Sequence, residues 1–147
     1  MYKYSYTLGN DVSEIKKINE KYLPENYKYT LWFEIVKNFP KYNFVCKKDN
    51  VIIGYVLGCP NFLEEKPDEI ILMSIAIEKE YRRKGIAKNL IKLFLKSVGE
   101  KKCILQVRES NKAISLYESL GFKQETIYQK YYKDGENALM MRYQKYN

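Results

Sequence analysis

An apolar run over residues 70–77 leads directly into a helical pattern over residues 84–98. The run is bounded by charge and is short enough for a buried β-strand, which we place at residues 68–78. In the second segment apolar residues recur every three or four positions, which is typical of a helix with one buried face. These residues are Ile86, Ala87, Leu90, Ile91, Phe94, Leu95 and Val98. Gly99 is expected to end this helix.

Shorter patterns fill the rest of the chain. Strands are expected over residues 2–8, 43–48, 51–58, 102–108, 122–130 and 137–144. Helices are expected from Asp11 or Ser13 to about Tyr22, from about Tyr27 to Asn38, and over 112–120, with a polar loop over 60–67. Early hairpins followed by strand–helix–strand predict an α/β (α+β) fold with a mixed, mostly antiparallel central sheet and helices on both faces. The length, 147 residues, predicts a single domain over 1–147.

The junction between the central strand and the long helix carries candidate chemistry. It reads Arg82-Arg83-Lys84-Gly85-Ile86-Ala87. The first N–H groups of a helix have no partners and the helix dipole adds positive charge there, so such a turn favours an anion. Gly85 lets a ligand approach the backbone because it lacks a Cβ. We therefore expect a phosphate or pyrophosphate here, although neither a P-loop nor a dinucleotide-binding glycine motif is present.

Composition excludes several kinds of site. The chain has no histidine, which removes His-activated nucleophiles and His-based metal sites and leaves carboxylates and tyrosines for acid–base work. We expect no metal cofactor. Cys46, Cys59 and Cys103 are odd in number and widely spaced, which argues against a disulfide framework and fits a reducing cytoplasm. No apolar stretch is long enough for a membrane span, and the N-terminus does not resemble a signal peptide.

The net charge of +8 leaves open a nucleic-acid-binding protein as an alternative class. The positive residues are spread along the chain rather than concentrated in one run. A basic cleft for a phosphate-rich cofactor accounts for part of the excess, so we expect no specific nucleic-acid partner.

Two sequence blocks carry a family resemblance. The R-x-x-G-x-A turn after a buried strand resembles the acetyl-CoA pyrophosphate loop of the GNAT superfamily of N-acetyltransferases. The second block resembles the superfamily's strand, Asn-x-x-Ala and helix ending in L-Y-x-x-L-G-F; here it runs from Leu105 through Asn111 and Ala113 to Leu116-Tyr117-Glu118-Ser119-Leu120-Gly121-Phe122. Asn111 is a good helix N-cap and Gly121 a good helix end.

Three further segments resemble the catalytic subunit of N-terminal acetyltransferase A. They are Leu23–Tyr27 (L-P-E-N-Y), Ile53–Gly58 (I-G-Y-V-L-G) and Lys130–Met141, which begins K-Y-Y-K-D-G-E. The bacterial ribosomal-protein alanine acetyltransferases share the second block and a similar Tyr-Tyr ending. The resemblance covers nearly the whole chain, and it implies a GNAT fold and acetyl transfer from acetyl-CoA to the N-terminal α-amine of a protein or peptide. It also suggests an auxiliary subunit that anchors the enzyme to the ribosome.

The resemblance implies roles for individual residues. Ile75 and Ile77 match the strand whose backbone pairs with pantetheine, and Asn111 matches the family's pantetheine-contacting Asn. The pyrophosphate is expected on the N–H groups of Arg83 to Ala87. Tyr117 matches the Tyr that protonates the CoA thiolate; the alternative is a core aromatic. The positions that line the peptide groove are Tyr27, Tyr131 and Tyr132.

The general base is where this chain departs from its relatives. Positions that hold His or Glu in the related enzymes are Ile71 and Gln106 here. Glu25 is then the best-matched carboxylate, either as the base, if a buried mouth raises its pKa, or as a group that positions the amine. Its alternative is an ordinary exposed loop carboxylate. Acetylation of small-molecule amines or of Lys side chains remains open as another substrate class.

Overall fold

The computed structural model describes residues 1–144. The strands are β1 Tyr2–Tyr6, β2 Phe44–Lys48, β3 Val51–Asn61, β4 Lys66–Ile77, β5 Lys102–Arg108, β6 Phe122–Tyr128 and β7 Ala138–Tyr143. The helices are α1 Val12–Tyr22, α2 Tyr29–Asn38, α3 Ile86–Val98 and α4 Ile114–Ser119, with single 3-10 turns at Gly9–Asp11, Pro40–Tyr42 and Lys79–Tyr81. Each predicted helix and strand is found, with shifts at the ends.

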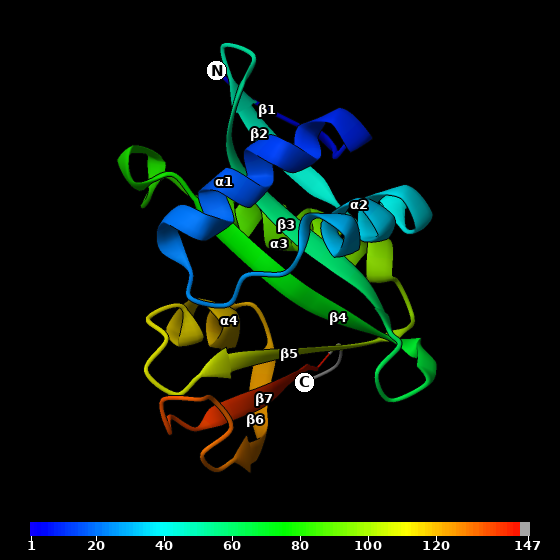
Figure 1. Ribbon diagram of the computed structural model, residues 1–147, viewed down its shortest axis with the longest axis vertical. Helices are drawn as coiled ribbons and strands as arrows, with labels where there is room; N and C mark the ends of the chain where they lie inside the picture. Colours follow the sequence, from blue (N-terminus) through cyan, green and yellow to red (C-terminus); the bar gives the residue numbers. More distant parts are fainter. Residues whose placement is uncertain (145–147) are drawn as a thin grey trace. The chain divides into compact units, whose positions relative to one another are not determined.

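The strands hydrogen-bond in the order β1-β2-β3-β4-β5-β7-β6 (Figure 1). β4 and β5 pair in parallel from Glu69–Lys102 to Leu72–Leu105, whereas the β1–β2, β2–β3, β5–β7 and β6–β7 pairs are antiparallel. The predicted mixed, mostly antiparallel sheet is therefore confirmed.

The chain divides into two compact units that share β4. The first unit contains Met1–Cys59 and Met73–Gly99, and the second contains Pro60–Leu72 and the chain from Glu100 onward. The single domain expected over residues 1–147 stays a prediction.

The first unit has an apolar core on each face of its strands. On one face, α1 and α2 pack against β2 and β3; this cluster includes Ile15, Trp32, Val45, Tyr55 and Leu57. On the other face lies α3. Figure 1 shows α1 and α2 in front of the strands and α3 behind them. Neighbouring strand residues point to opposite faces, so Tyr55 meets α2 while a Cβ at Gly54 would lie 3.6 Å from Leu90 Cδ1 of α3.

In the second unit, α4 and the β6–β7 hairpin share an aromatic cluster. Phe122 is buried, with ring centroids 6.0 Å from Tyr117 and 5.4 Å from Tyr143. Gly121 ends α4 with a φ of 107°, as predicted for the Gly of L-G-F.

Among the predicted boundaries that differ from the structure, two have identifiable reasons in the hydrogen bonds of Asn61 and Trp32. Residues 60–67 do not form a long loop, because β3 continues to Asn61 and β4 starts at Lys66. The Asn61 amide is buried and donates to Glu64 and Glu69, each at 2.8 Å, which closes a tight hairpin. Helix α2 starts at Tyr29 rather than Tyr27, because the Trp32 indole donates to the Tyr27 carbonyl at 3.1 Å and keeps that residue in the preceding loop.

Gly121 should tolerate no side chain. A Cβ there would lie 2.9 Å from Tyr143 Cε1. We expect Gly121→Ala to lower the free energy of unfolding by roughly 2–5 kcal/mol, combining about 1–2 for the left-handed backbone with about 1–3 for overpacking. Gly135 also has a positive φ, but a Cβ there meets nothing within 4 Å, so Gly135→Ala should lose only the backbone part. Urea denaturation of both variants measures the difference, and equal losses would show that Tyr143 moves aside at no cost.

Candidate active site

The turn between β4 and α3 is exposed and strongly cationic. Arg82, Arg83, Lys84 and Gly85 are all solvent-exposed. Arg83 and Gly85 have positive φ values of 63° and 81°. The left-handed Gly85 makes α3 begin at Ile86, two residues later than the sequence pattern predicted.

The N-terminus of α3 has the features of an anion site. Its first internal hydrogen bond is donated by Asn89 N to Gly85 O at 3.0 Å, so the N–H groups of Ile86, Ala87 and Lys88 come before the helical ladder. Gly85 is the N-cap and has no side chain to accept from them. A Cβ at Gly85 would meet nothing within 4 Å, which shows that the space beside this backbone is open. An anion can therefore reach these donors.

The Arg82 side chain makes contacts within the first unit. Its Nε donates to the Ile77 carbonyl at 3.0 Å, and its guanidinium carbon lies 4.4 Å from the centroid of the Tyr22 ring. The Tyr22 hydroxyl in turn donates to Glu78 Oε1 at 2.6 Å, and Lys21 Nζ donates to the same oxygen at 2.8 Å. Burial alone would raise the pKa of Glu78, but the Lys21 and Tyr22 hydrogen bonds outweigh it and hold that pKa below its usual range. These contacts fix the start of the turn against the end of α1.

The predicted cofactor strand leads directly into this turn. Within β4, Ile75 is half-buried and Ile77 is buried. The Glu78 N–H donates to the Ile53 carbonyl of β3 at 2.8 Å. The structure thus brings Ile75, Ile77 and the segment 82–87 together as one continuous edge of the first unit.

The loop Leu23–Tyr27 belongs to the same unit and is held by neighbouring helices. Asn19 of α1 donates to the Glu25 carbonyl at 3.2 Å, and Trp32 of α2 donates to the Tyr27 carbonyl. The side chains of Glu25 and Tyr27 are half-buried. The predicted amine-binding residues therefore lie on a loop whose backbone is fixed at both ends.

Tyr117 and Asn111 lie in the second unit. Tyr117 is buried, with only 3% of its surface exposed, and its ring packs edge-on against Phe122. The prediction that Asn111 is the N-cap of α4 was wrong, because α4 starts at Ile114 and its N-cap is Ala113. Asn111 Oδ1 instead accepts from Ala113 N at 2.7 Å in the turn before the helix. The Tyr117 ring is therefore part of the core, and the role predicted for its hydroxyl stays a prediction.

Tyr131 and Tyr132 lie together on the loop between β6 and β7, with ring centroids 5.2 Å apart. Tyr131 is exposed and Tyr132 is half-buried. Asp134-Gly135 turns the chain, with Gly135 N donating to the Tyr132 carbonyl at 2.9 Å.

Sequence reasoning missed Arg108, which organises this loop. Its Nη1 donates to Asp134 at 2.7 Å and to Glu136 at 3.0 Å, and its guanidinium carbon lies 4.1 Å from the centroid of the Tyr132 ring. The pKa of Asp134 is lowered by the backbone N–H of Glu136 and by Arg108. The sequence has no local signal for these contacts, because Asp134 and Glu136 lie 26 and 28 residues beyond Arg108.

Comparison with known proteins identifies the family. A family model described as "Acetyltransferase (GNAT) family" matches residues 10–122. This chain belongs to the GNAT family of acetyltransferases. The predicted superfamily and enzyme class are therefore confirmed.

Individual relatives of this GNAT protein are named as N-acetyltransferases. An N-alpha-acetyltransferase of Saccharolobus solfataricus is 39% identical over 153 aligned positions, covering 92% of this chain and 91% of the relative. The catalytic subunit ard1 of the N-terminal acetyltransferase A complex of Schizosaccharomyces pombe is 34% identical, covering 90% of this chain and 79% of its own length. The crystal structure of the Escherichia coli ribosomal-protein-S18-alanine N-acetyltransferase matches with a TM-score of 0.80 and 26% identity, covering 97% of this chain and 93% of that one.

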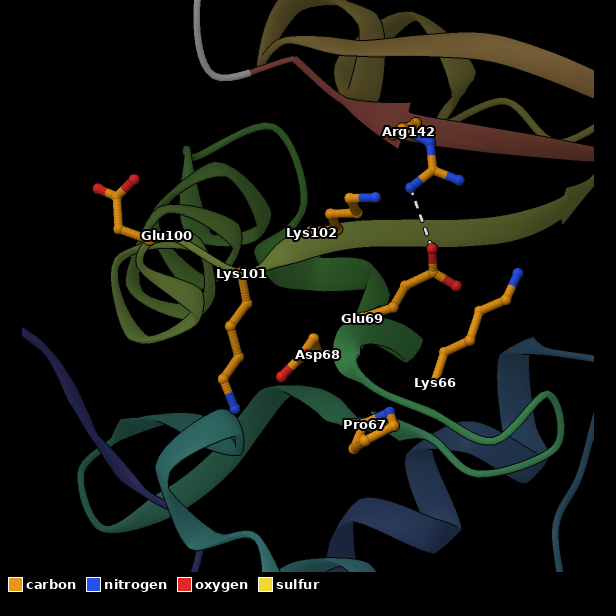
Figure 2. A pocket seen from close by; sticks show the side chains of 8 residues that line it. All are labelled: Lys66, Pro67, Asp68, Glu69, Glu100, Lys101, Lys102 and Arg142. Atoms are coloured by element: carbon orange, nitrogen blue, oxygen red, sulfur yellow. Dashed lines mark hydrogen bonds and ion pairs between the residues drawn. The ribbon is translucent and has the colours of Figure 1, made fainter.

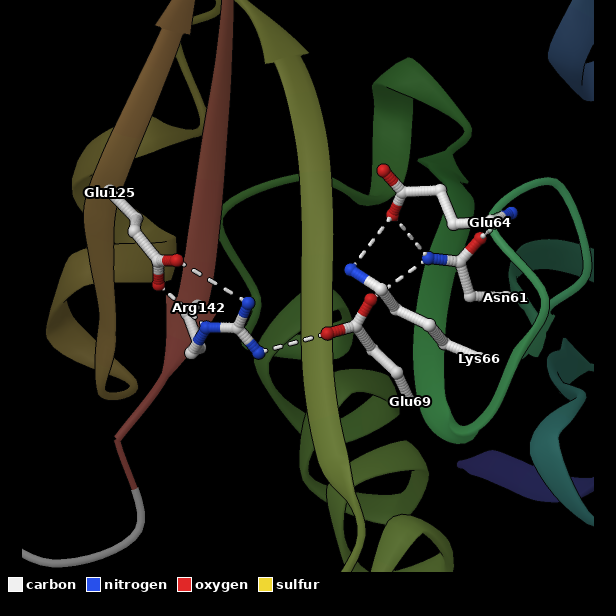
Figure 3. A network of polar contacts seen from close by, with 6 residues as sticks. All are labelled: Asn61, Glu64, Lys66, Glu69, Glu125 and Arg142. Carbon is white, nitrogen blue, oxygen red and sulfur yellow. Dashed lines mark hydrogen bonds and ion pairs between the residues drawn. The ribbon is translucent and has the colours of Figure 1, made fainter.

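A separate hollow of about 610 Å³ in the second unit of this GNAT protein contains none of the predicted site residues (Figure 2). It is lined by Lys66, Pro67, Asp68, Glu69, Glu100, Lys101, Lys102 and Arg142. Figure 3 shows that its most buried charges are already paired: Glu69 accepts from Asn61 at 2.8 Å and from Arg142 at 3.0 Å. Arg142 also donates to Glu125 at 2.6 Å. This network ties β4, β7 and β6 together and leaves no unpaired buried charge to bind a ligand.

Residues 1–144 contain no group of three or more His, Cys, Asp or Glu side chains placed to hold a metal ion. No helix in the described part of the chain is long and apolar enough to cross a membrane. Ile71 and Gln106, which the family resemblance matched to positions of a catalytic base, are half-buried and exposed respectively. Neither side chain can accept a proton at neutral pH.

Gly85→Glu should abolish acetyl-CoA binding, because both the added side chain and its negative charge would meet the pyrophosphate. Gly99→Glu is the matched control: it adds the same charge at a left-handed, exposed glycine at the other end of α3. We expect calorimetry to detect no acetyl-CoA binding to Gly85→Glu and near-normal affinity in Gly99→Glu. Normal affinity in a folded Gly85→Glu protein would place the phosphate site elsewhere.

Proposed function

We propose that this GNAT enzyme transfers the acetyl group of acetyl-CoA directly to the N-terminal α-amine of proteins or peptides. The observation that carries the proposal is the open, uncapped N-terminus of α3 behind a cationic turn. The near full-length similarity to proteins named N-alpha-acetyltransferases supports the choice of amine.

Cofactor binding is assigned to one edge of the first unit and to Asn111. The N–H groups of Arg83 to Ala87 would hold the pyrophosphate, with Arg82, Arg83 and Lys84 adding charge. The backbone of Ile75 and Ile77 would pair with pantetheine, since these residues lie beyond the last β4–β5 pair at Leu72. Asn111 would contact pantetheine through its amide. Acetyl-CoA supplies the acetyl group as a thioester.

The remaining chemistry needs few protein groups. A protein α-amine has a pKa of roughly 7.7–8.0, against about 10.4 for Lys, so a useful fraction is neutral at physiological pH. Glu25 would accept the amine proton or hold the amine in place. Tyr117 would give its hydroxyl proton to the leaving thiolate.

The substrate peptide would be bound by aromatic side chains with hydroxyl groups. Tyr27 would contact it from the Leu23–Tyr27 loop, and Tyr131 and Tyr132 from the β6–β7 loop. Arg108 would keep the second pair in place through its bonds to Asp134 and Glu136.

The proposal extends to the cellular compartment and to partner proteins. We propose a single-domain enzyme that works in the cytoplasm. The three cysteines are free and buried, which fits a reducing compartment. The similarity to a protein named as the catalytic subunit of a complex supports an auxiliary partner. Anchoring of the enzyme to the ribosome is the role that the sequence resemblance suggests for this partner. Small-molecule or Lys-directed acetylation is the alternative substrate class.

A peptide array separates these substrate classes. Free N-termini should be acetylated, whereas the same peptides with blocked N-termini and internal Lys should not, because the Lys amine is almost fully protonated. Mass spectrometry locates the acetyl group. Modification confined to Lys side chains, or found only on polyamines offered in parallel, would overturn the proposed substrate.

Glu25→Gln should lower turnover by roughly 10²–10⁴ with acetyl-CoA affinity unchanged if Glu25 is the base. If Glu25 only positions the amine, KM should rise and kcat stay nearly constant. Glu20→Gln, an exposed carboxylate on α1, is the control. Steady-state kinetics with a free-N-terminus peptide decides, and wild-type kinetics in Glu25→Gln would discard both roles.

Tyr117→Phe should lower kcat while leaving peptide affinity little changed, because it removes only the hydroxyl and keeps the ring on Phe122. Tyr143→Phe is the matched control, since Tyr143 packs on the same Phe122 ring. Equal kcat in the two variants would argue that Tyr117 is only a core residue.

A further inference from the structure

Asn19 is a polar residue in an otherwise apolar part of the core. It lies in the last turns of α1 and has none of its surface exposed. Ile15 and Ile18 of the same helix belong to the apolar cluster on this face, as does Tyr55 of β3. A buried amide at such a position needs a reason other than apolar packing.

The hydrogen bonds of Asn19 link three elements. Its Nδ2 donates to the Glu25 carbonyl at 3.2 Å and approaches Ser74 Oγ of β4 at 3.4 Å. Ser74 Oγ lies 2.8 Å from the Tyr55 hydroxyl. The Asn19 backbone carbonyl accepts from Leu23 N at 2.8 Å. One residue therefore holds the loop at its first residue and again at Glu25.

Asn19, Ser74 and Tyr55 form a buried polar column, and the Tyr55 hydroxyl at its base stays neutral. Burial raises the pKa of Tyr55 to about 12, against the lowering effect of its polar neighbours Ser74 and Asn19. Its hydroxyl keeps its proton across the physiological range, so the Tyr55–Ser74 hydrogen bond does not change with pH there.

Asn19 is not the most stabilising residue for its position. Its Oδ1 is buried without a hydrogen-bond partner in the described part of the chain. Exchanging the amide's O and N would turn the oxygen toward the Glu25 carbonyl, so the orientation is set by the loop. An orphaned buried acceptor destabilises the folded state, whereas a Leu of similar size would not. A Leu at this position could not donate a hydrogen bond to the Glu25 carbonyl, as Asn19 does.

We propose that Asn19 is a positioning residue that fixes the Glu25-bearing loop to the buried Ser74–Tyr55 pair and thereby sets the amine site. This inference rests on the proposed function, and it adds a residue that never touches substrate. Glu25 and Ser74 are joined through one amide, so the loop that receives the amine is tied to the strand assigned to the cofactor.

Asn19→Leu tests the proposal because function and stability should separate. Losing a hydrogen bond of ordinary net strength reduces the population of the competent loop, so peptide KM should rise roughly three- to tenfold with kcat within about twofold. Acetyl-CoA affinity should be unchanged. The melting temperature should be equal or higher, because the orphaned acceptor is gone.

Hydrogen–deuterium exchange gives a readout that does not depend on turnover. The amides of residues 25–28 should exchange roughly three- to tenfold faster in Asn19→Leu, whereas those of α3 should not change. Thr7→Val is the matched control: Thr7 Oγ1 is the other buried side-chain atom without a partner in the described residues, and it lies in the same unit. Thr7→Val should alter neither KM nor loop exchange.

The outcomes are distinguishable. Unchanged KM and unchanged loop exchange in Asn19→Leu would overturn the proposal. So would a lower melting temperature accompanied by a parallel loss of acetyl-CoA affinity, which would make Asn19 a general structural residue. If Asn19→Leu does not fold, Asn19→Ala is measured in the same way. If the wild-type enzyme acetylates no peptide, the proposed function fails, and loop exchange still decides whether Asn19 holds the loop.

Discussion

The unpaired N–H groups at the start of α3 are the constraint on which the rest of the proposed site depends. A helix N-terminus must satisfy these groups with a cap, water or a ligand. Here the cap position is Gly85, which offers no side chain, and the flanking residues are cations. Tyr22, Glu78 and Arg82 fix the turn from the other side. The strand before it is buried and the helix after it packs Leu90 and Phe94 into the core, so this backbone is held open toward an anion.

A second constraint is the buried polar column beneath the Leu23–Tyr27 loop. Apolar packing would make this region more stable, yet Asn19 and Ser74 are buried among apolar side chains. Leu23 and Tyr27 at the two ends of the loop pack against the apolar cluster, and the Asn19 amide holds the Glu25 backbone between them. Arg108 acts in the same way. Its ion pairs with Asp134 and Glu136 hold the Tyr131–Tyr132 segment. Asn19 and Arg108 are thus polar side chains whose main structural effect is to hold a loop in place.

Much of the fold could be predicted because its signals are local. The β4–α3 segment is indicated by a short apolar run followed by a 3.6-residue period, and the Gly121 helix end is a single-residue signal. The predicted Asn111 cap was wrong, because the N-cap of α4 is Ala113. What escaped prediction depends on partners distant in sequence. Nothing near Arg82 indicates that its guanidinium lies on Tyr22, and nothing near Arg108 specifies Asp134. Asn19 fits a polar position of an amphipathic helix, and only the fold reveals that the core surrounds it. The Pro60–Pro67 segment looked like a loop because composition does not show that the Asn61 amide is buried.

The most direct test of the account is the affinity of a CoA–peptide conjugate in which CoA is linked to the α-amine of a short peptide. If the cofactor and the peptide N-terminus are bound side by side, the linked ligand should bind at least about a hundredfold more tightly than CoA alone, because the second half binds at high effective concentration. Calorimetry with CoA, the Nα-acetylated peptide and the conjugate measures this gain. A conjugate that binds no better than CoA alone would contradict the account.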